Sequence, residues 1–96
     1  MHIVNGRNIS DIVNRDDWQK LRRSLLGTWL KTPKENVIKL RNFLGDIENA
    51  EMDKLIIVYN YLTGSVFRTK LVEHPSIDKL KKEIKDELIR RKKLLS

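Results

Sequence analysis

Residues 32–45 read TPKENVIKLRNFLG and contain the signals that start and stop a helix. Thr32 at the cap position, Pro33 at the first helical position and Glu35 three residues after the cap predict a capping box. Apolar residues then recur at helical spacing and form one inner stripe: Val37, Leu40 and Leu44, with Phe43 adjacent. We therefore expect a helix over 33–44 that stops at Gly45.

The preceding segment, 16–30, predicts a second helix. Asp16 is placed to accept hydrogen bonds from first-turn amides, and Asp17 suits the positive end of the helix dipole. One apolar stripe has spacings of three and four: Trp18, Leu21, Leu25 and Trp29, with Leu26 and Leu30 beside it. Because both tryptophans share this stripe, we expect them in the core. Gly27 costs about 1 kcal/mol relative to alanine inside a helix, so we interpret it as a close helix contact.

The segment after Gly45 allows two interpretations. In the first, Asn49 caps a helix that ends at Thr63-Gly64 and has apolar positions at Met52, Leu55, Ile56, Tyr59 and Leu62. However, the run 55–59 is β-branched and aromatic, as is typical of a buried strand. The alternative is therefore a β-hairpin over 55–72, which would make the fold α+β and winged-helix-like.

The last predicted helix follows the break at His74-Pro75 and runs from a Ser76 cap to about Leu94. Its apolar face consists of Ile77, Leu80, Ile84 and Leu88. Three acid-to-base pairs have the favourable i,i+4 order: Asp78/Lys82, Asp86/Arg90 and Glu87/Arg91. The apolar seam is interrupted at its next positions, Glu87 and Arg91, so we do not expect a long coiled coil.

Length and composition predict one small domain over residues 1–96. With 40% hydrophobic residues, the chain has enough apolar material for one modest core. We expect a mainly α fold, a compact bundle of four to five helices with a long basic C-terminal helix. The Asn5-Gly6 pair predicts a flexible or hairpin arm at 1–9, and residues 90–96 are expected to form a frayed basic tail.

The formal net charge of +7 is concentrated at the two ends of the chain. Residues 1–31 contain six Lys/Arg and three Asp/Glu, residues 32–64 four and five, and residues 65–96 ten and five. The three segments therefore carry +3, −1 and +5, which sum to +7. Such asymmetry concerns binding partners rather than fold.

The residues needed for catalysis or metal binding are sparse. The chain has no cysteine and only two histidines, His2 and His74, and its four glycines are too scattered for a phosphate-binding loop. A nuclease-like set of Asp78 with residues 83–85 falls on one salt-bridged helix, where a solvated surface is the better interpretation. We therefore expect no metal, no cofactor and no enzymatic activity.

The start of the chain lacks the charged and apolar regions of a signal peptide, and the longest apolar stretch is only residues 55–59. We expect a soluble, cytoplasmic protein without a membrane role. Ten Ile, seven Asn and twelve Lys against a single Ala suggest an AT-rich genome, which suits a viral or microbial origin.

Clustered basic residues predict a nucleic-acid-binding surface, because neutralising phosphates requires grouped Lys and Arg. The candidates are Arg68, Lys70, Lys81, Lys82, Lys85, Arg90, Arg91, Lys92 and Lys93. The competing interpretation is that basic residues in a last turn complement the helix dipole and solubilise the end of the helix. On the first reading, the protein is a nucleic-acid-binding or transcription-associated regulator.

A protein-binding adaptor or inhibitor is the second functional class, with a homodimer as one form of association. A helix-turn-helix over 37–55 is disfavoured, because four acidic residues of its recognition segment would repel phosphates: Asp46, Glu48, Glu51 and Asp53. Leu94 and Leu95 follow the basic run without an obvious core partner and could contact another protein.

Overall fold

The computed structural model describes residues 12–64 and 74–95, without the side chains of 93–95. Its elements in chain order are α2 (Asp16–Leu25), α3 (Pro33–Leu44), the 3-10 turn η1 (Ile47–Asn49), α4 (Met52–Leu62) and α6 (Pro75–Leu95). These residues contain no strand. The radius of gyration is 13.4 Å, close to the roughly 12.5 Å of a compact chain of this length. The expected mainly helical, compact fold is confirmed, whereas the predicted arm at 1–9 lies outside the described residues.

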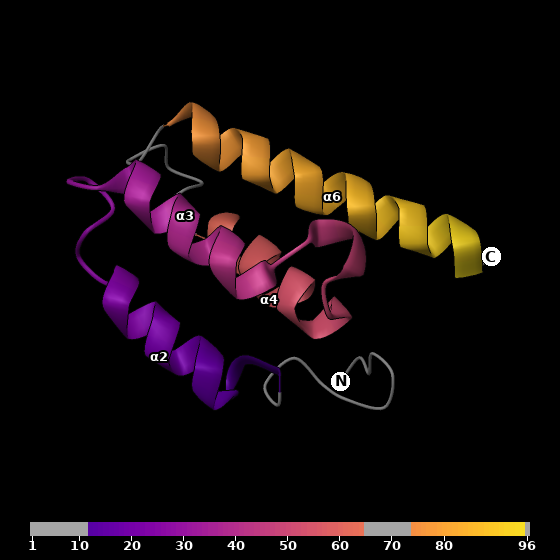
Figure 1. Ribbon diagram of the computed structural model, residues 1–96, viewed down its shortest axis with the longest axis horizontal. Helices are drawn as coiled ribbons and strands as arrows, with labels where there is room; N and C mark the ends of the chain where they lie inside the picture. The colour runs from indigo at the N-terminus through magenta and orange to yellow at the C-terminus, as the bar shows by residue number, and fades with distance from the viewer. Residues whose placement is uncertain (1–11, 65–73, 96) are drawn as a thin grey trace.

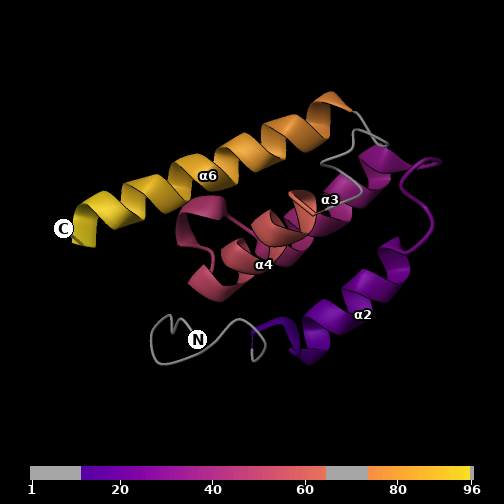
Figure 2. The ribbon, with the colours of Figure 1, turned by 180° about the vertical axis from the view of Figure 1, so that it is seen from behind.

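Helices α3 and α4 lie between α2 and α6 (Figures 1 and 2). Helix α6 packs along both α3 and α4, and α2 packs against α3 on the other side. The helices meet in one apolar core, whose fully buried side chains include Leu25, Leu40, Leu55, Leu80 and Ile84. This arrangement leaves one long face of α6 toward solvent.

Helix α3 has the bounds predicted from its sequence, but its first turn is not a capping box. Thr32 occupies the cap position, yet its Oγ1 donates to the Thr28 carbonyl oxygen 3.2 Å away and bonds no first-turn amide. Glu35 is exposed to solvent. At the other end Gly45 has φ of 71°, a conformation that favours glycine, and its amide donates to the Arg41 carbonyl.

Helix α2 is shorter than predicted and ends at Leu25. Leu26 is extended and Gly27 has φ of 75°, so the chain leaves the helix before Trp29. The predicted close helix contact at Gly27 is wrong, because no atom lies within 4 Å of the position its Cβ would take. The predicted Asp16 cap is also wrong, since Arg15 precedes the helix and no side chain caps it.

Both tryptophans belong to the core, as predicted, although only Trp18 is in a helix. The Trp18 ring lies 5.7 Å from the Phe43 ring and 5.3 Å from the Tyr61 ring. The Trp29 Nε1 donates to the Tyr61 hydroxyl oxygen at 2.6 Å, which anchors the α2–α3 connection to α4. The core thus holds the connection in place even though its backbone is not helical.

Residues 52–62 form helix α4, so the hairpin alternative over 55–72 is not seen in the described residues, which stop at 64 before that hairpin's second strand. Asn49 does not cap this helix, because it ends η1 and the cap position is Glu51. Helix α6 begins at Pro75 rather than after a Ser76 cap. The Ser76 amide instead donates to the Nδ1 of His74 at 3.2 Å.

Candidate functional site

The inner seam of α6 begins apolar and ends charged. Ile77, Leu80 and Ile84 are buried in the core. Continuing the same spacing of three and four residues brings Glu87 and Arg91 to the same side of the helix. Glu87 is only 5% exposed and Arg91 is partly buried. The positions that interrupt the apolar seam therefore face the body of the protein.

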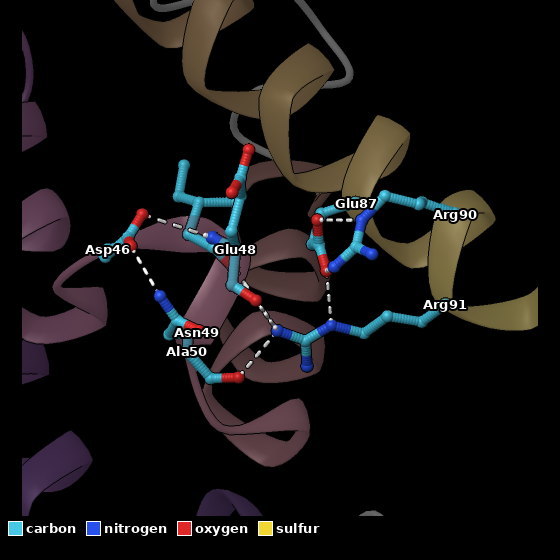
Figure 3. A network of polar contacts seen from close by, with 8 residues as sticks. Asp46, Glu48, Asn49, Ala50, Glu87, Arg90 and Arg91 are labelled. Atoms are coloured by element: carbon cyan, nitrogen blue, oxygen red, sulfur yellow. Dashed lines mark hydrogen bonds and ion pairs between the residues drawn. The ribbon is translucent and has the colours of Figure 1, made fainter. Parts of the chain in front are cut away.

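Two arginines surround the Glu87 carboxylate (Figure 3). Arg90 donates through Nε at 2.9 Å and through Nη2 at 2.6 Å, and Arg91 donates through Nε at 2.5 Å. The hydrogen bonds from Arg90 outweigh the effect of burial and, with those from Arg91, lower the pKa of Glu87 from 4.5 to about 2. Glu87 is therefore ionised across the neutral range.

Arg91 also joins α6 to η1. Its Nη2 donates to three main-chain carbonyl oxygens: Ile47 at 3.3 Å, Glu48 at 3.2 Å and Ala50 at 2.8 Å. The turn that presents them is closed by Asp46, whose carboxylate accepts from the Asn49 side chain at 2.6 Å and from the Glu48 amide at 3.4 Å (Figure 3). One guanidinium thus donates to a carboxylate and to three carbonyl groups, of which the Ile47 carbonyl also accepts from the Ala50 amide.

Arg90 and Arg91 were predicted to contact phosphates, and the structure engages both in contacts to Glu87. A phosphate would compete with these hydrogen bonds, most strongly at Arg91. A third acid–base contact on this side joins α6 to α3, because Arg41 Nη2 lies 2.5 Å from a Glu83 carboxylate oxygen. The Arg41 hydrogen bonds, opposed in part by desolvation, lower the pKa of Glu83.

The predicted lysines of α6 lie on a different side of the helix. Lys82 and Lys85 are exposed and Lys81 is partly exposed. At about 100° per residue, these three fall within a sector of about 100° that includes neither Glu83 nor Glu87. Lys92, which is exposed, falls in the same sector eleven residues after Lys81. We call these four residues, Lys81, Lys82, Lys85 and Lys92, the lysine stripe.

The remaining predicted basic residues are not placed. Arg68 and Lys70 lie outside the described residues, and Lys93 belongs to α6 without a described side chain. The structure therefore gathers four of the nine candidates on one face and engages two others in internal contacts.

An open groove of about 550 Å³ lies on the arginine side of α6, next to η1 and the end of α3. It is lined by Arg41, Gly45, Asp46, Ile47, Glu48, Glu83, Asp86, Glu87 and Arg90. Five of these residues are acidic and two are basic, so the groove is negatively charged. The two sides of α6 thus differ in charge, basic along the lysine stripe and acidic along the groove.

Sequence reasoning missed two features of this surface. The predicted Glu87/Arg91 ion pair is confirmed, but the sequence analysis does not predict that Glu87 is buried or that Arg90 also binds it. Leu26 and Leu30 were expected beside the stripe of a longer helix, but each is 78% exposed. The signal for their exposure was Gly27, which ends the helix instead of packing inside it.

Within residues 12–64 and 74–95, no group of three or more His, Cys, Asp or Glu residues could hold a metal ion. In the same ranges, no helix combines the length and the apolar character needed to cross a bilayer. Comparison of the chain with protein-family models, with curated proteins and with solved structures found no match.

Proposed function

We propose that this chain is a non-enzymatic, basic binding module that contacts nucleic acid through the lysine stripe of α6. The observation that carries the proposal is the separation of charge around this helix. Glu83 and Glu87, which could repel phosphates, are on the other side and are paired with arginines. The sector of the stripe contains four lysines and one exposed aspartate, Asp78, so this side of α6 is net positive.

The dimensions of the stripe suit a polyanion. From Lys81 to Lys92 is eleven residues, or about 16 Å along the helix axis. One strand of B-form DNA presents a phosphate about every 3.4 Å, so this length faces about five phosphates. Lysine is a flexible point charge without the planar fork that reads bases, so we expect binding with little sequence preference.

The test is a fluorescence anisotropy titration with labelled duplex and single-stranded oligonucleotides at 50 and 200 mM salt. The variant K81Q/K82Q/K85Q removes three lysines of the stripe. The matched control K20Q/K39Q/K79Q removes three exposed lysines elsewhere and has the same net charge. Removing three phosphate contacts should reduce the slope of log K against log salt by about 2.7 for duplex DNA, and the control should keep the wild-type slope.

Two results would contradict the proposal. If both triple variants lose affinity equally, binding depends on overall charge and not on the stripe. If the wild-type protein binds neither oligonucleotide at 50 mM salt, nucleic acid is not the ligand of this surface.

A second candidate function is protein binding, and the exposure of Leu26 and Leu30 favours it. Large apolar side chains that the fold holds in solvent are a feature of protein contact sites. A partner held mainly by these leucines would bind with weak salt dependence and would be lost in an L26S/L30S variant. Measuring both properties on the same complex separates this function from nucleic-acid binding.

A further inference from the structure

The α2–α3 connection is an ordered loop that presents two leucines to solvent. Leu26 and Leu30 are each 78% exposed, while Trp29 between them is buried and hydrogen-bonded to Tyr61. Thr28 further fixes the loop, because its hydroxyl donates to the Leu25 carbonyl at 2.9 Å. The exposure of the leucines is therefore imposed by the fold.

The helix ends on either side of this loop are basic, and the loop itself contains Lys31. Residues 18–34 contain five basic residues and no Asp or Glu: Lys20, Arg22, Arg23, Lys31 and Lys34. Four of them flank the two leucines within four residues along the chain, namely Arg22, Arg23, Lys31 and Lys34. We call Leu26, Leu30 and these four cations the leucine loop. Its ligand must offer both an apolar contact and negative charge.

The groove beside η1 has the complementary properties. Its two arginines are already paired, Arg41 with Glu83 and Arg90 with Glu87. Three other carboxylates of its lining, those of Asp46, Glu48 and Asp86, make no salt bridge to any residue in the described part of the chain. Ile47 supplies apolar surface, and the volume of about 550 Å³ leaves room for inserted side chains. We call this site the acidic groove.

The leucine loop and the acidic groove cannot meet within one molecule. The loop directly precedes α3 and the groove-forming η1 directly follows it, so the twelve residues of α3 hold them about 18 Å apart. Figure 1 shows the connection before α3 and the turn after it at opposite ends of that helix. A contact between them therefore requires two copies of the chain.

We propose that the leucine loop of one copy docks into the acidic groove of a second copy. Leu26 and Leu30 enter the groove beside Ile47, and the loop cations approach Asp46, Glu48 and Asp86. The two contacting surfaces are different, so in a dimer one copy keeps an unused groove and the other copy keeps an unused loop. Such a heterologous contact produces head-to-tail oligomers that grow with concentration, or a closed ring. The contact does not depend on nucleic-acid binding.

Sedimentation velocity of two complementary variants tests this contact. L26S/L30S removes the apolar tip and leaves the groove intact. E48K/D86K reverses two exposed groove charges and leaves the loop intact. I38S/I89S is the matched control, because Ile38 and Ile89 are the other exposed large apolar residues, at 50% and 43% exposure, within the described residues. Circular dichroism verifies that each variant is folded.

The proposal predicts a specific pattern of masses. The average mass of the wild-type protein and of I38S/I89S rises with concentration from the micromolar to the millimolar range. Each of the variants L26S/L30S and E48K/D86K, measured separately, remains a monomer. An equimolar mixture of these two doubles in mass to a one-to-one dimer and grows no further, since it has one intact loop and one intact groove to use.

Three outcomes overturn the proposal. The first is that the wild-type protein remains a monomer at all concentrations. The second is that the mixture of the two variants fails to form a dimer. The third is a monomeric wild-type protein that binds phosphatidylglycerol vesicles through Leu26 and Leu30, which would assign the loop to an anionic lipid surface.

Discussion

Replacing Glu87 by glutamine should weaken the fold by removing a buried charge that two arginines surround. The change keeps the size of the side chain and removes the charge that Arg90 and Arg91 surround. Arg91 has a side chain that is only 17% exposed, so it would be left partly buried without a counter-charge. Only the hydrogen bonds of Arg91 to the carbonyl oxygens at η1 would then stabilise its positive charge.

The size of the effect follows from the pKa of Glu87, which falls from 4.5 to about 2 in the folded protein. That difference corresponds to at most roughly 3 kcal/mol. The Arg90 side chain is 51% exposed, so solvent screens its share of the interaction. We expect Glu87→Gln to lower the free energy of unfolding by about 2 kcal/mol and the midpoint of thermal unfolding by roughly 10 °C.

The pH dependence has a defined sign. The pKa of Glu87 is lower in the folded than in the unfolded state, so its stabilisation is complete above about pH 4.5 and is lost as the pH falls toward 2. The Glu87→Gln variant should therefore lose less stability than wild type over this range. Part of the acid sensitivity should remain, since the pKa values of Glu83 and Asp17 are lowered as well.

Urea unfolding followed by circular dichroism at pH 7 and pH 3 measures both effects. Asp86→Asn is the control, because Asp86 is the exposed neighbour of Glu87 and makes no salt bridge to a described residue. Its stability should change by less than about 0.5 kcal/mol. If Glu87→Gln unfolds at the same urea concentration as Asp86→Asn, the Glu87 network does not stabilise the fold and the reasoning is refuted.

Two further substitutions test the backbone and the core. Gly45→Ala should cost about 1 kcal/mol in urea unfolding, because alanine is strained at φ of 71° although no atom obstructs its Cβ; an unchanged midpoint would show that the chain does not need this conformation. Leu80→Ala removes a fully buried side chain where α6 meets the core and should cost about 2–5 kcal/mol; a cost near that of a surface mutation would contradict the packing of α6.

Helix positions could be predicted where local signals and packing agree. Residues 33–44 form the expected helix because Pro33 can begin a helix, Gly45 can end one, and Val37, Leu40 and Leu44 are buried together. Residues 52–62 suited either a helix or a strand, since β-branched and aromatic side chains are well packed in both. Burial of Leu55, Ile57, Val58 and Leu62 against other helices decides for the helix.

The predicted helix over 16–30 was too long, because Gly27 can either continue a helix or end it. The apolar spacing continued through Gly27 to Leu30, but periodicity does not say whether a glycine continues a helix or ends it. Here Gly27 takes positive φ, and Trp29 reaches the core from a turn instead of a helix. The capping predictions at Thr32, Asn49 and Ser76 failed for a related reason, because each hydroxyl or amide side chain contacts another partner nearby.

For the candidate site, the sequence predicts which residue types are present but not how the fold arranges them. The sequence shows that basic residues cluster after residue 76, but not which of them the fold engages internally. Arg91 and Lys92 are neighbours in the chain, yet Arg91 points toward η1 and Lys92 is exposed. That difference depends on the rotation of α6 about its axis, which is set by contacts with α3, α4 and η1.

An NMR titration of the ¹⁵N-labelled protein with a short DNA duplex tests the central claim most directly, because it reports which residues the nucleic acid contacts. We predict that amide signals of residues 81–92 on the lysine-stripe side of α6 shift progressively, while those of the α2–α3 loop and η1 stay in place. Shifts confined to the α2–α3 loop, or no shifts at 50 mM salt, would contradict the proposed nucleic-acid surface.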